Sequence, residues 1–393
     1  MKPTLLIPAS AVSLLAMLAM PLQSLAQEQP DTHHPTHYRV TDLGTLGGTS
    51  ATAFGISYSG RVAGSANLIA GGPQHAFISS DGGLKDLGTL GGPNSLANGL
   101  NSSDELAIYS ETADPAYMDE DFCGFGNHLQ CLAAVWRHGK MTPLSTLPGG
   151  DSAQAIAINN RGQVAGFAEN DTLNDPGHCK QPFQVHHFEA VIWGPDPETV
   201  RELRPLPGDT VGFALSLNDK GQAVGSSGHC FNTTTAFPVY GPHAVLWDTD
   251  GSVTDLGNLG GTMVNVAAGI NNRGQVVGAA EVKGGNVHAF LWTKDTGMKD
   301  LGLLGSDTMA DPFWVNNLGQ VVGGSCSATG NCRAFLWEGK TLIDLNTLIP
   351  ADSPLYLLVA FGINDSGEIV GQALTQSGEI HAFRATPDCN GTN

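Results

Sequence analysis

Carboxylates and histidines gather in two polar stretches of the sequence, between residues 119 and 128 and between residues 171 and 187. Carboxylate and imidazole groups are the ligands of divalent cations and the proton carriers of acid–base catalysis. No spacing typical of such a site is present, since the sequence lacks H-E-x-x-H and the loop of an EF-hand. We therefore predict an acidic, solvated loop surface with no catalytic residue and no cofactor, and keep a structural divalent cation as the alternative. The candidate ligands are Asp119, Glu120, Asp121, His128, Asp171, Asp175, His178, His186 and His187.

Seven cysteines could form disulfides or bind zinc. The first residues of the chain indicate export, and export favours disulfides over zinc. Two pairs are close enough in sequence to close their own loops, and a third would join equivalent loops of neighbouring repeats. The predicted pairs are Cys123–Cys131, Cys326–Cys332 and Cys179–Cys230. Cys389 remains as an odd seventh cysteine without a predicted partner.

The elements that must position these groups are clearest between residues 255 and 292, where four short apolar runs follow one another. They read DLG, AGIN, QVVG and HAFLW, and each has the length of a β-strand. The sequence NNRG at residues 271–274 separates the second and third runs, and Asn and Gly accept the positive φ that tight turns need. The many glycines would interrupt a helix. This segment is therefore predicted to form four antiparallel strands.

The four runs recur seven times, and the intervals between successive Asn-turn positions are 44, 58, 59, 53, 45 and 48 residues. A four-stranded propeller blade takes about 40 to 50 residues, whereas one coil of a β-solenoid needs roughly half that. We predict an all-β fold, a single seven-bladed β-propeller over residues 38–384 with four antiparallel strands per blade. The chain begins with an unaccompanied fourth strand at residues 38–44 and ends with a third strand at residues 381–384. We expect the N-terminal strand to complete the last blade and close the ring, which removes open strand edges.

The motifs DLGTLGG, GINNRGQVVG and HAFLW resemble those of the HAF-repeat family of exported bacterial proteins, and the resemblance covers residues 38–384. It implies export and a β-repeat architecture. It supplies no catalytic residues, so any site must be found from this chain's own residues.

The first 26 residues have the pattern of a secretory signal. Lys2 precedes an apolar stretch that runs to Met20, and residues 24–26 read SLA, a small-x-small cleavage pattern that ends at Ala26. A transmembrane anchor is the alternative, but two prolines break the apolar run. We predict a signal peptide at residues 1–26, a polar lead at 27–37 and a C-terminal tail at 385–393. The mature protein is expected to be secreted or periplasmic.

The composition limits the partners. Lys and Arg number 18 against 37 Asp and Glu, so the net charge is −19. Such a charge repels nucleic acids and anionic membrane surfaces. We expect no nucleic-acid partner, no membrane span after signal removal, and a monomer.

Four of the third strands begin with histidine, at His75, His243, His288 and His381. Other repeats carry Leu132, Glu189 or Arg333 at this position, so a ring of metal ligands is excluded. We expect each histidine to make a structural hydrogen bond to a neighbouring blade.

The loops between second and third strands vary most among the repeats, and in a meander they all lie at one end of the sheets. The longest are predicted at residues 111–131, 168–187 and 226–242, which also hold the candidate ligands. Specific recognition needs an asymmetric surface, so we predict a non-enzymatic, exported binding module for a protein or glycan at these loops. A lyase or hydrolase that uses the carboxylates and histidines of the same loops is the alternative.

Overall fold

The computed structural model describes residues 36–174, 185–229 and 243–388. These residues belong to one compact unit, Pro35–Asn393. Apart from two short 3₁₀ turns, η1 (Tyr117–Asp119) and η2 (Leu345–Thr347), every regular element in these ranges is a β-strand. No helix within them is long and apolar enough to span a membrane. The prediction of an all-β chain is confirmed.

Five sheets have four strands each, and in four of them strands consecutive in sequence are hydrogen-bonded and antiparallel. The first sheet contains β2 (Ala51–Ile56), β3 (Val62–Asn67), β4 (Gln74–Ser80) and β5 (Gly83–Asp86). The second contains β6 (Gly91–Leu100), β7 (Leu106–Pro115), β8 (Leu129–Arg137) and β9 (Lys140–Pro143). The third contains β10 (Ala153–Ile158), β11 (Val164–Leu173), β12 (His186–Trp193) and β13 (Val200–Leu203). The fourth contains β14 (Val211–Leu217), β15 (Ala223–Gly228), β16 (His243–Trp247) and β17 (Val253–Asp255).

The next eight strands form two such meanders, which one parallel pair between Val287 and Met309 joins into a single sheet. They are β18 (Gly260–Ile270), β19 (Val276–Val282), β20 (Val287–Thr293), β21 (Gly297–Gly302), β22 (Met309–Val315), β23 (Val321–Cys326), β24 (Cys332–Glu338) and β25 (Thr341–Asp344). The last sheet contains β26 (Leu355–Ile363), β27 (Ile369–Thr375), β28 (Ile380–Pro387) and β1 (Tyr38–Gly44). In this sheet β1 pairs antiparallel with β28, so that Tyr38 lies opposite Pro387 and Asp42 opposite Phe383.

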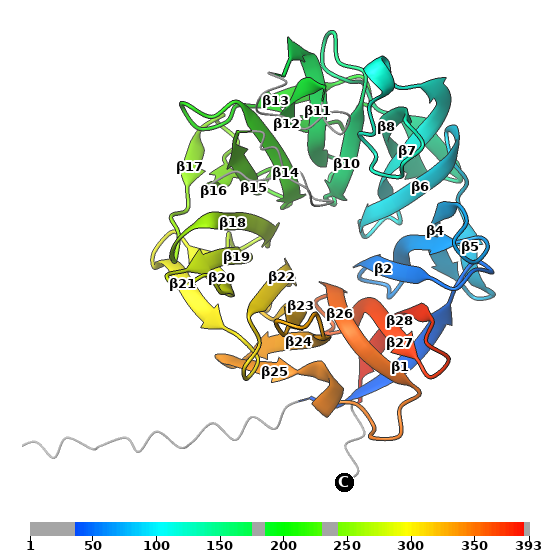
Figure 1. Cartoon of the computed structure of the whole chain (residues 1–393), viewed down its shortest axis with the longest axis vertical. Helices are drawn as coiled ribbons and strands as arrows, with labels where there is room; N and C mark the ends of the chain where they lie inside the picture. Colours follow the sequence, from blue (N-terminus) through cyan, green and yellow to red (C-terminus); the bar gives the residue numbers. More distant parts are fainter. Residues whose placement is uncertain (1–35, 175–184, 230–242, 389–393) are drawn as a thin grey trace, which may run out of the picture. The chain divides into compact units, whose positions relative to one another are not determined.

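The sheets are arranged around a central axis, with the first strand of each meander innermost (Figure 1). This arrangement is a β-propeller. The apolar core lies between neighbouring sheets: Ala63 and Ile78 of the first sheet pack with Leu106 and Ile108 of the second, and all four are fully buried. Burial of one such large side chain stabilises the fold by about 1.5–3 kcal/mol.

The repeated glycine of QVVG and the repeated phenylalanine of HAF depend on each other. Gly278 lies opposite Phe290, and a Cβ atom at Gly278 would lie 2.7 Å from the Phe290 ring and 2.0 Å from the Val266 carbonyl oxygen. Only glycine allows the first strand and the buried ring to approach the second strand so closely. The equivalent pairs are Gly64 with Phe77, Gly323 with Phe335 and Gly371 with Phe383.

The asparagine of each INN-type turn fastens one four-stranded meander to the next. Asn271 uses Oδ1 to accept the backbone N–H groups of Arg273 and Gln275, and its Nδ2 donates to the carbonyl of Asn316 at 2.9 Å. This bond between neighbouring meanders is found at six positions in the described ranges. The donors and acceptors are Asn101 to Asn159, Asn159 to Asn218, Asn218 to Asn271, Asn271 to Asn316, Asn316 to Asn364 and Asn364 to Ser57.

The repeated histidine contacts its own sheet. His288 Nδ1 lies 3.0 Å from the carboxylate of Asp300, which faces Phe290 across the β20–β21 pair. The prediction of a bond to a neighbouring blade is therefore wrong, because the histidine and the DLG aspartate are diagonal neighbours on adjacent strands of one sheet. The other pairs of this kind are His75–Asp86, His243–Asp255 and His381–Asp42.

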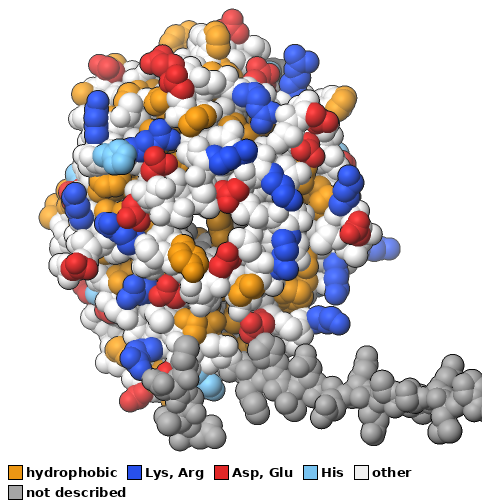
Figure 2. Space-filling model, turned by 180° about the vertical axis from the view of Figure 1, so that it is seen from behind, with side chains coloured by type: hydrophobic (Ala, Val, Ile, Leu, Met, Phe, Trp, Pro, Cys, Tyr) orange, Lys and Arg blue, Asp and Glu red, His pale blue; other side chains and the backbone are white. Residues whose placement is uncertain are grey.

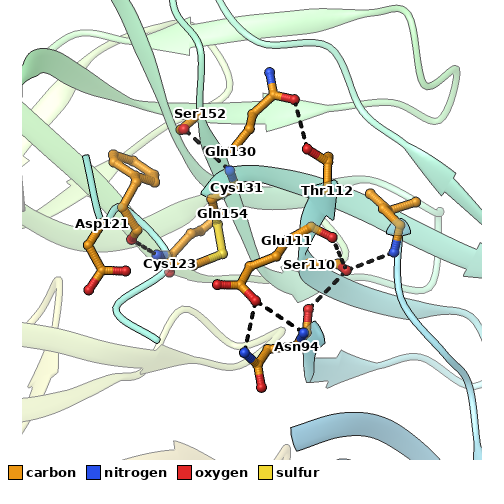
Figure 3. Close-up of a disulfide and its surroundings, with 12 residues drawn as sticks. Asn94, Ser110, Glu111, Thr112, Asp121, Cys123, Gln130, Cys131, Ser152 and Gln154 are labelled. Carbon is orange, nitrogen blue, oxygen red and sulfur yellow. Dashed lines mark hydrogen bonds between the residues drawn. A yellow bond between two sulfur atoms is a disulfide. The ribbon is translucent and has the colours of Figure 1, made fainter. Parts of the chain in front are cut away.

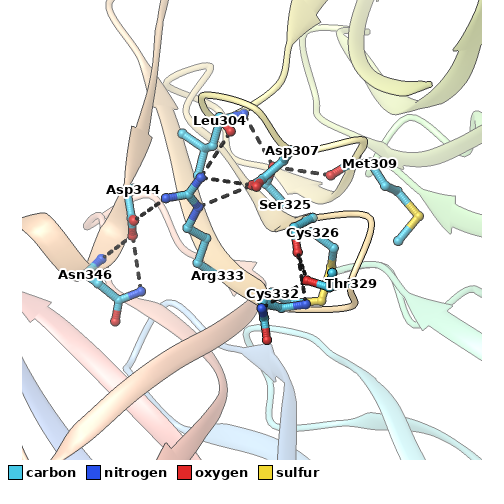
Figure 4. Close-up of polar contacts among 12 residues, drawn as sticks. Leu304, Asp307, Met309, Ser325, Cys326, Thr329, Cys332, Arg333, Asp344 and Asn346 are labelled. Carbon is cyan, nitrogen blue, oxygen red and sulfur yellow. Dashed lines mark hydrogen bonds and ion pairs between the residues drawn. A yellow bond between two sulfur atoms is a disulfide. The ribbon is translucent and has the colours of Figure 1, made fainter.

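Arg333 occupies the histidine position on β24. Its guanidinium group contacts Asp344 of β25 at 3.4 Å and Asp307, in the connection between β21 and β22, at 3.2 Å (Figure 4). The carboxylate of Asp307 also accepts the hydroxyl of Ser325 at 2.8 Å. The arginine therefore ties the connection to the sheet as well as β24 to β25.

Candidate functional site

The long loop of the second sheet leaves β7 after Pro115, forms η1 and returns to β8 at Leu129. A disulfide between Cys123 and Cys131 closes part of it (Figure 3). Within the loop, both carboxylate oxygens of Asp121 accept the N–H of Gly126 at 3.0 Å. These contacts give the loop a defined conformation.

The loop is also fastened to the third sheet. Gln154 of β10 donates its side-chain amide to the carbonyl of Phe122 at 2.7 Å. The Phe122 ring contacts Phe167 of β11 at 5.6 Å between centroids and Phe188 of β12 at 6.3 Å. These aromatic rings form an apolar cluster that spans the second and third sheets and extends to Phe213 of the fourth.

Two carboxylates and one imidazole meet where the loop of the second sheet lies against the third sheet. Glu120 comes from the loop of the second sheet, Glu169 from β11 and His186 from the first position of β12. One potential ligand atom of each lies within 4.8 Å of the other two. Glu120 and Glu169 have no exposed surface, and His186 is 6% exposed. We refer to these three residues as the Glu–Glu–His cluster.

Each carboxylate of the cluster has one oxygen in use. Glu120 Oε1 accepts the N–H of Val185 at 2.5 Å, and Glu169 Oε2 accepts the N–H of Ser152 at 2.9 Å. The other oxygens, Glu120 Oε2 and Glu169 Oε1, and the imidazole Nδ1 of His186 are buried without a hydrogen-bond partner among the described residues. His186 Nδ1 lies 3.8 Å from Glu169 Oε1. A buried polar atom without a partner is unusual in a native protein, and three together require an explanation.

The surroundings of the cluster disfavour charge on its members. Burial raises the pKa of both Glu120 and Glu169, and the negative charge of Glu169 raises the pKa of Glu120 further. Burial lowers the pKa of His186. The imidazole is therefore neutral at pH 7 and keeps a lone pair. The two carboxyl groups can both ionise only with a positive charge between them; without it they retain a shared proton and only one of them is ionised.

One wall of the cluster comes from the loop and from the connection between β9 and β10. The ring of Tyr117 stacks on the imidazole of His186, with centroids 4.9 Å apart. The carboxylate of Asp151 accepts the N–H of Tyr117 and the side-chain amide of Gln130, each at 3.1 Å. Asp151 thus holds the stacked tyrosine in place.

Two of the predicted ligands, Glu120 and His186, belong to the cluster. The other described candidates are dispersed and do not join it. Asp119 is exposed and only approaches His128, at 4.0 Å, while Asp121 stabilises its own loop. Asp171 is exposed, and His187 is half-buried. Asp175 and His178 lie outside the described residues.

Glu169 is not among the ligands predicted from the sequence. It occupies the position that follows the second-strand motif, and Glu111 and Glu281 occupy the same position in other repeats. Those carboxylates also accept backbone N–H groups at the start of the first strand, from Asn94 to Glu111 and from Thr262 to Glu281. An acid that recurs in three repeats was the available signal, but it lies within a strand motif rather than in a loop.

Both disulfides predicted within loops are present, Cys123–Cys131 and Cys326–Cys332. Cys179, Cys230 and Cys389 lie outside the described residues. The confirmed disulfides close loops at the same end of the sheets, since each begins at or beyond the end of a second strand.

Exposed apolar side chains concentrate at this end of the sheets, which also carries the connections from fourth to first strands. We call it the loop face, and the opposite end, with the hairpin turns, the turn face. Of ten large exposed apolar residues in the described ranges, only Tyr58 and Leu318 lie in hairpin turns. The eight on the loop face are Ile69, Tyr117, Met118, Leu173, Met263, Met309, Tyr356 and Leu374. The large exposed apolar side chains of the described ranges are therefore unevenly distributed between the two faces.

The loops of this face are also acidic. Outside the strands, its described residues include two bases, Arg204 and Lys283, and eight acids. The acids are Asp119, Asp151, Asp209, Asp352 and Glu379, which are exposed or half-buried, and Glu120, Asp121 and Asp307, which are buried. Figure 2 shows one face of the molecule, on which Lys and Arg are interspersed with Asp and Glu around a central hollow. The loop face therefore suits neutral or cationic ligands better than anionic ones.

No family model and no curated protein matches this sequence. Among solved structures, the chain is similar to virginiamycin B lyase from Staphylococcus aureus, with 12% identity over 89% of this chain and 100% of that chain and a TM-score of 0.50. It is less similar to the β-propeller domain of the Trilobed protease from Pyrococcus furiosus, with 13% identity over 74% and 79% of the two chains and a TM-score of 0.44. A lectin from Aleuria aurantia matches with 9% identity over 91% and 100% and a TM-score of 0.37.

At these identities the likeness to the lyase concerns the fold alone. It agrees with the sheet arrangement, and the chain is a β-propeller protein. The propeller fold occurs in enzymes and in binding proteins, so function must be argued from the site.

Proposed function

We propose that this chain is an exported, non-enzymatic binding module that contacts a protein or glycan through its loop face. The observation that carries the proposal is the location of eight of the ten large exposed apolar side chains on that face. Exposed apolar groups next to fixed polar ones suit a sugar ring or a protein surface. The negative charge of the acidic loops disfavours the binding of anionic partners.

We extend the proposal to the number of blades, to the closure of the ring and to the protein family. We infer seven blades of four strands, with β1 completing the last blade, and membership of the HAF-repeat family. The β1–β28 pairing and the bond from Asn364 to the carbonyl of Ser57 support ring closure. The signal-like residues before Ala26 and the two disulfides support export to the periplasm or beyond.

A lyase or hydrolase at the rim is the second candidate, and the Glu–Glu–His cluster is the observation that favours it. Two carboxyl groups with raised pKa values beside a neutral imidazole are suitable acids and bases. Their burial argues against this role, because a substrate would need to contact groups with 0% and 6% exposure. The binding module is therefore the preferred function.

The test compares the two faces with matched substitutions. One variant carries Ile69→Ser, Met263→Ser and Tyr356→Ser on the loop face, and the other carries Tyr58→Ser and Leu318→Ser on the turn face. Labelled protein is applied to a glycan array and to immobilised bacterial envelope proteins. We expect the loop-face variant to lose the binding of the wild type and the turn-face variant to keep it. The reverse pattern, or equal loss in both variants at unchanged circular dichroism, would assign binding elsewhere.

A further inference from the structure

We propose that Glu120, Glu169 and His186 bind one divalent metal ion, with Zn²⁺ the preferred occupant, and that this ion fastens the loop of the second sheet to the third sheet. This site goes beyond the binding function proposed above and does not depend on it. Three observations carry it: the convergence of the donor atoms, their lack of other partners and the chemistry of the donor set.

The donor atoms converge from separate elements. Glu120 follows η1 in the loop, Glu169 lies near the end of β11, and His186 begins β12. Their potential ligand atoms lie within 4.8 Å of one another. Atoms bound to one Zn²⁺ ion at about 2.0–2.2 Å lie roughly 3–4 Å apart. The 3.8 Å between His186 Nδ1 and Glu169 Oε1 already falls within that range.

The free atoms are the ones that a metal ion would use. Ser152 and Val185 donate to one oxygen of each carboxylate and thereby orient the group. The second oxygen of each, and Nδ1 of His186, have no partner among the described residues. Leaving such an atom buried and unpaired destabilises the fold, and more so if the atom is charged. A cation between the two carboxylates would satisfy all three atoms and offset the repulsion.

The donor set selects the class of metal. Two carboxylate oxygens and one imidazole nitrogen match Zn²⁺ and neighbouring transition metals, whereas Ca²⁺ and Mg²⁺ prefer sites made only of oxygen. A His₂Glu or HisGlu₂ set supplies three ligands and leaves a fourth position for water. The repeat explains how the site arose from a structural carboxylate. Glu111 and Glu169 hold equivalent positions in their repeats. The Oε1 atom of Glu111 accepts a hydrogen bond from the side-chain amide of Asn127, whereas that of Glu169 faces Glu120 and His186.

A proton shared by Glu120 and Glu169 is the competing way to relieve the repulsion. It would leave His186 unpaired and would give no affinity for metal. Glu111→Gln is the matched control, because Glu111 is equally buried and occupies the same repeat position, but its Oε1 accepts the side-chain amide of Asn127.

The experiment uses tag-free protein from residue 27 onward, stripped with a chelator and titrated with ZnCl₂ by calorimetry. CaCl₂ and MgCl₂ serve as comparison ions. Wild type and Glu111→Gln are expected to bind one Zn²⁺ at this site with affinities within about threefold of each other. Glu169→Gln and His186→Gln should each weaken that binding by about 100-fold or more. At Zn²⁺ of about 100 times Kd, the Tm of wild type should rise by about 4 °C or more, with no rise in those two variants.

If the other variants fold poorly, Glu120→Gln still tests the proposal. It removes one of two repelling carboxyl groups, so the metal-free variant should melt at or above the temperature of metal-free wild type while it loses the Zn²⁺ site. Absence of saturable binding to wild type would overturn the proposal in favour of the shared proton. Unchanged Zn²⁺ affinity in Glu120→Gln and Glu169→Gln would place bound zinc elsewhere, and would also overturn it. Neither outcome bears on ligand binding by the loop face, which is measured separately.

Discussion

Replacement of Asn271 by alanine should destabilise the propeller by several kcal/mol. The side chain is 4% exposed and makes four hydrogen bonds. Its Oδ1 accepts the N–H groups of Arg273 and Gln275, each at 3.0 Å, and its Nδ2 donates to Gln275 Oε1 at 2.8 Å and to the Asn316 carbonyl at 2.9 Å. Each bond contributes about 1 kcal/mol, so the expected loss is roughly 3–5 kcal/mol. The largest share should come from the buried carbonyl of Asn316, because water reaches the turn more easily.

The assay is equilibrium unfolding in guanidinium chloride, followed by circular dichroism and by tryptophan fluorescence. Coincident transitions from the two probes are needed before a free energy is derived. Arg273→Ala is the control, since Arg273 is exposed in the same turn and should change stability by no more than about 0.5 kcal/mol. A loss below about 1 kcal/mol for Asn271→Ala would refute the reasoning, because the bond between the two meanders would then add almost nothing. A loss confined to one probe would show instead that a single sheet separates locally.

Three further predictions concern positions where one repeat departs from the others. Ser57 occupies the asparagine position in the first sheet, so Ser57→Asn should add the inter-sheet bond and raise stability by about 1 kcal/mol, measured as an increase in Tm. Burial, and then the charge of Glu202, raise the pKa of Glu189 from 4.5 to about 8. The folded chain therefore holds a proton that the unfolded chain releases, so wild-type stability should fall as the pH rises from about 5 to 8. Glu189→Gln should flatten that profile, and parallel profiles would contradict the pKa assignment. Cys332→Ser removes the disulfide to Cys326, which lies 6 residues earlier in the sequence. The free energy of unfolding under non-reducing conditions should fall by about 2 kcal/mol, and an unchanged midpoint of unfolding would count against the disulfide.

Much of the fold could be predicted because its repeats are encoded locally. The NNRG turn, the alternating apolar runs and the glycines indicate strands without reference to distant residues. The Gly278–Phe290 pair shows why the pattern recurs, since a buried ring in one strand requires a missing side chain in the next. The same locality explains the two confirmed disulfides, in which the cysteines are separated by 8 and 6 residues.

The partner of the repeated histidine shows where local reasoning failed. The motif indicates that His288 has a structural role, but it cannot distinguish a partner on the next strand from one on the next blade. The register of β20 against β21 decided this, because it places Asp300 opposite Phe290 and within 3.0 Å of the histidine.

The candidate site divides in the same way. The sequence by itself determined that carboxylates and histidines occur in the loops of the second and third repeats, and it included Glu120 and His186 among nine candidates. Only the tertiary structure decided that these two meet Glu169, while Asp119, Asp121 and His128 remain apart. The physical reason is that the cluster depends on how a loop folds back across a sheet boundary and on which carboxylate oxygens remain free there. Those properties arise from packing between distant segments, and no local pattern of residue types records them.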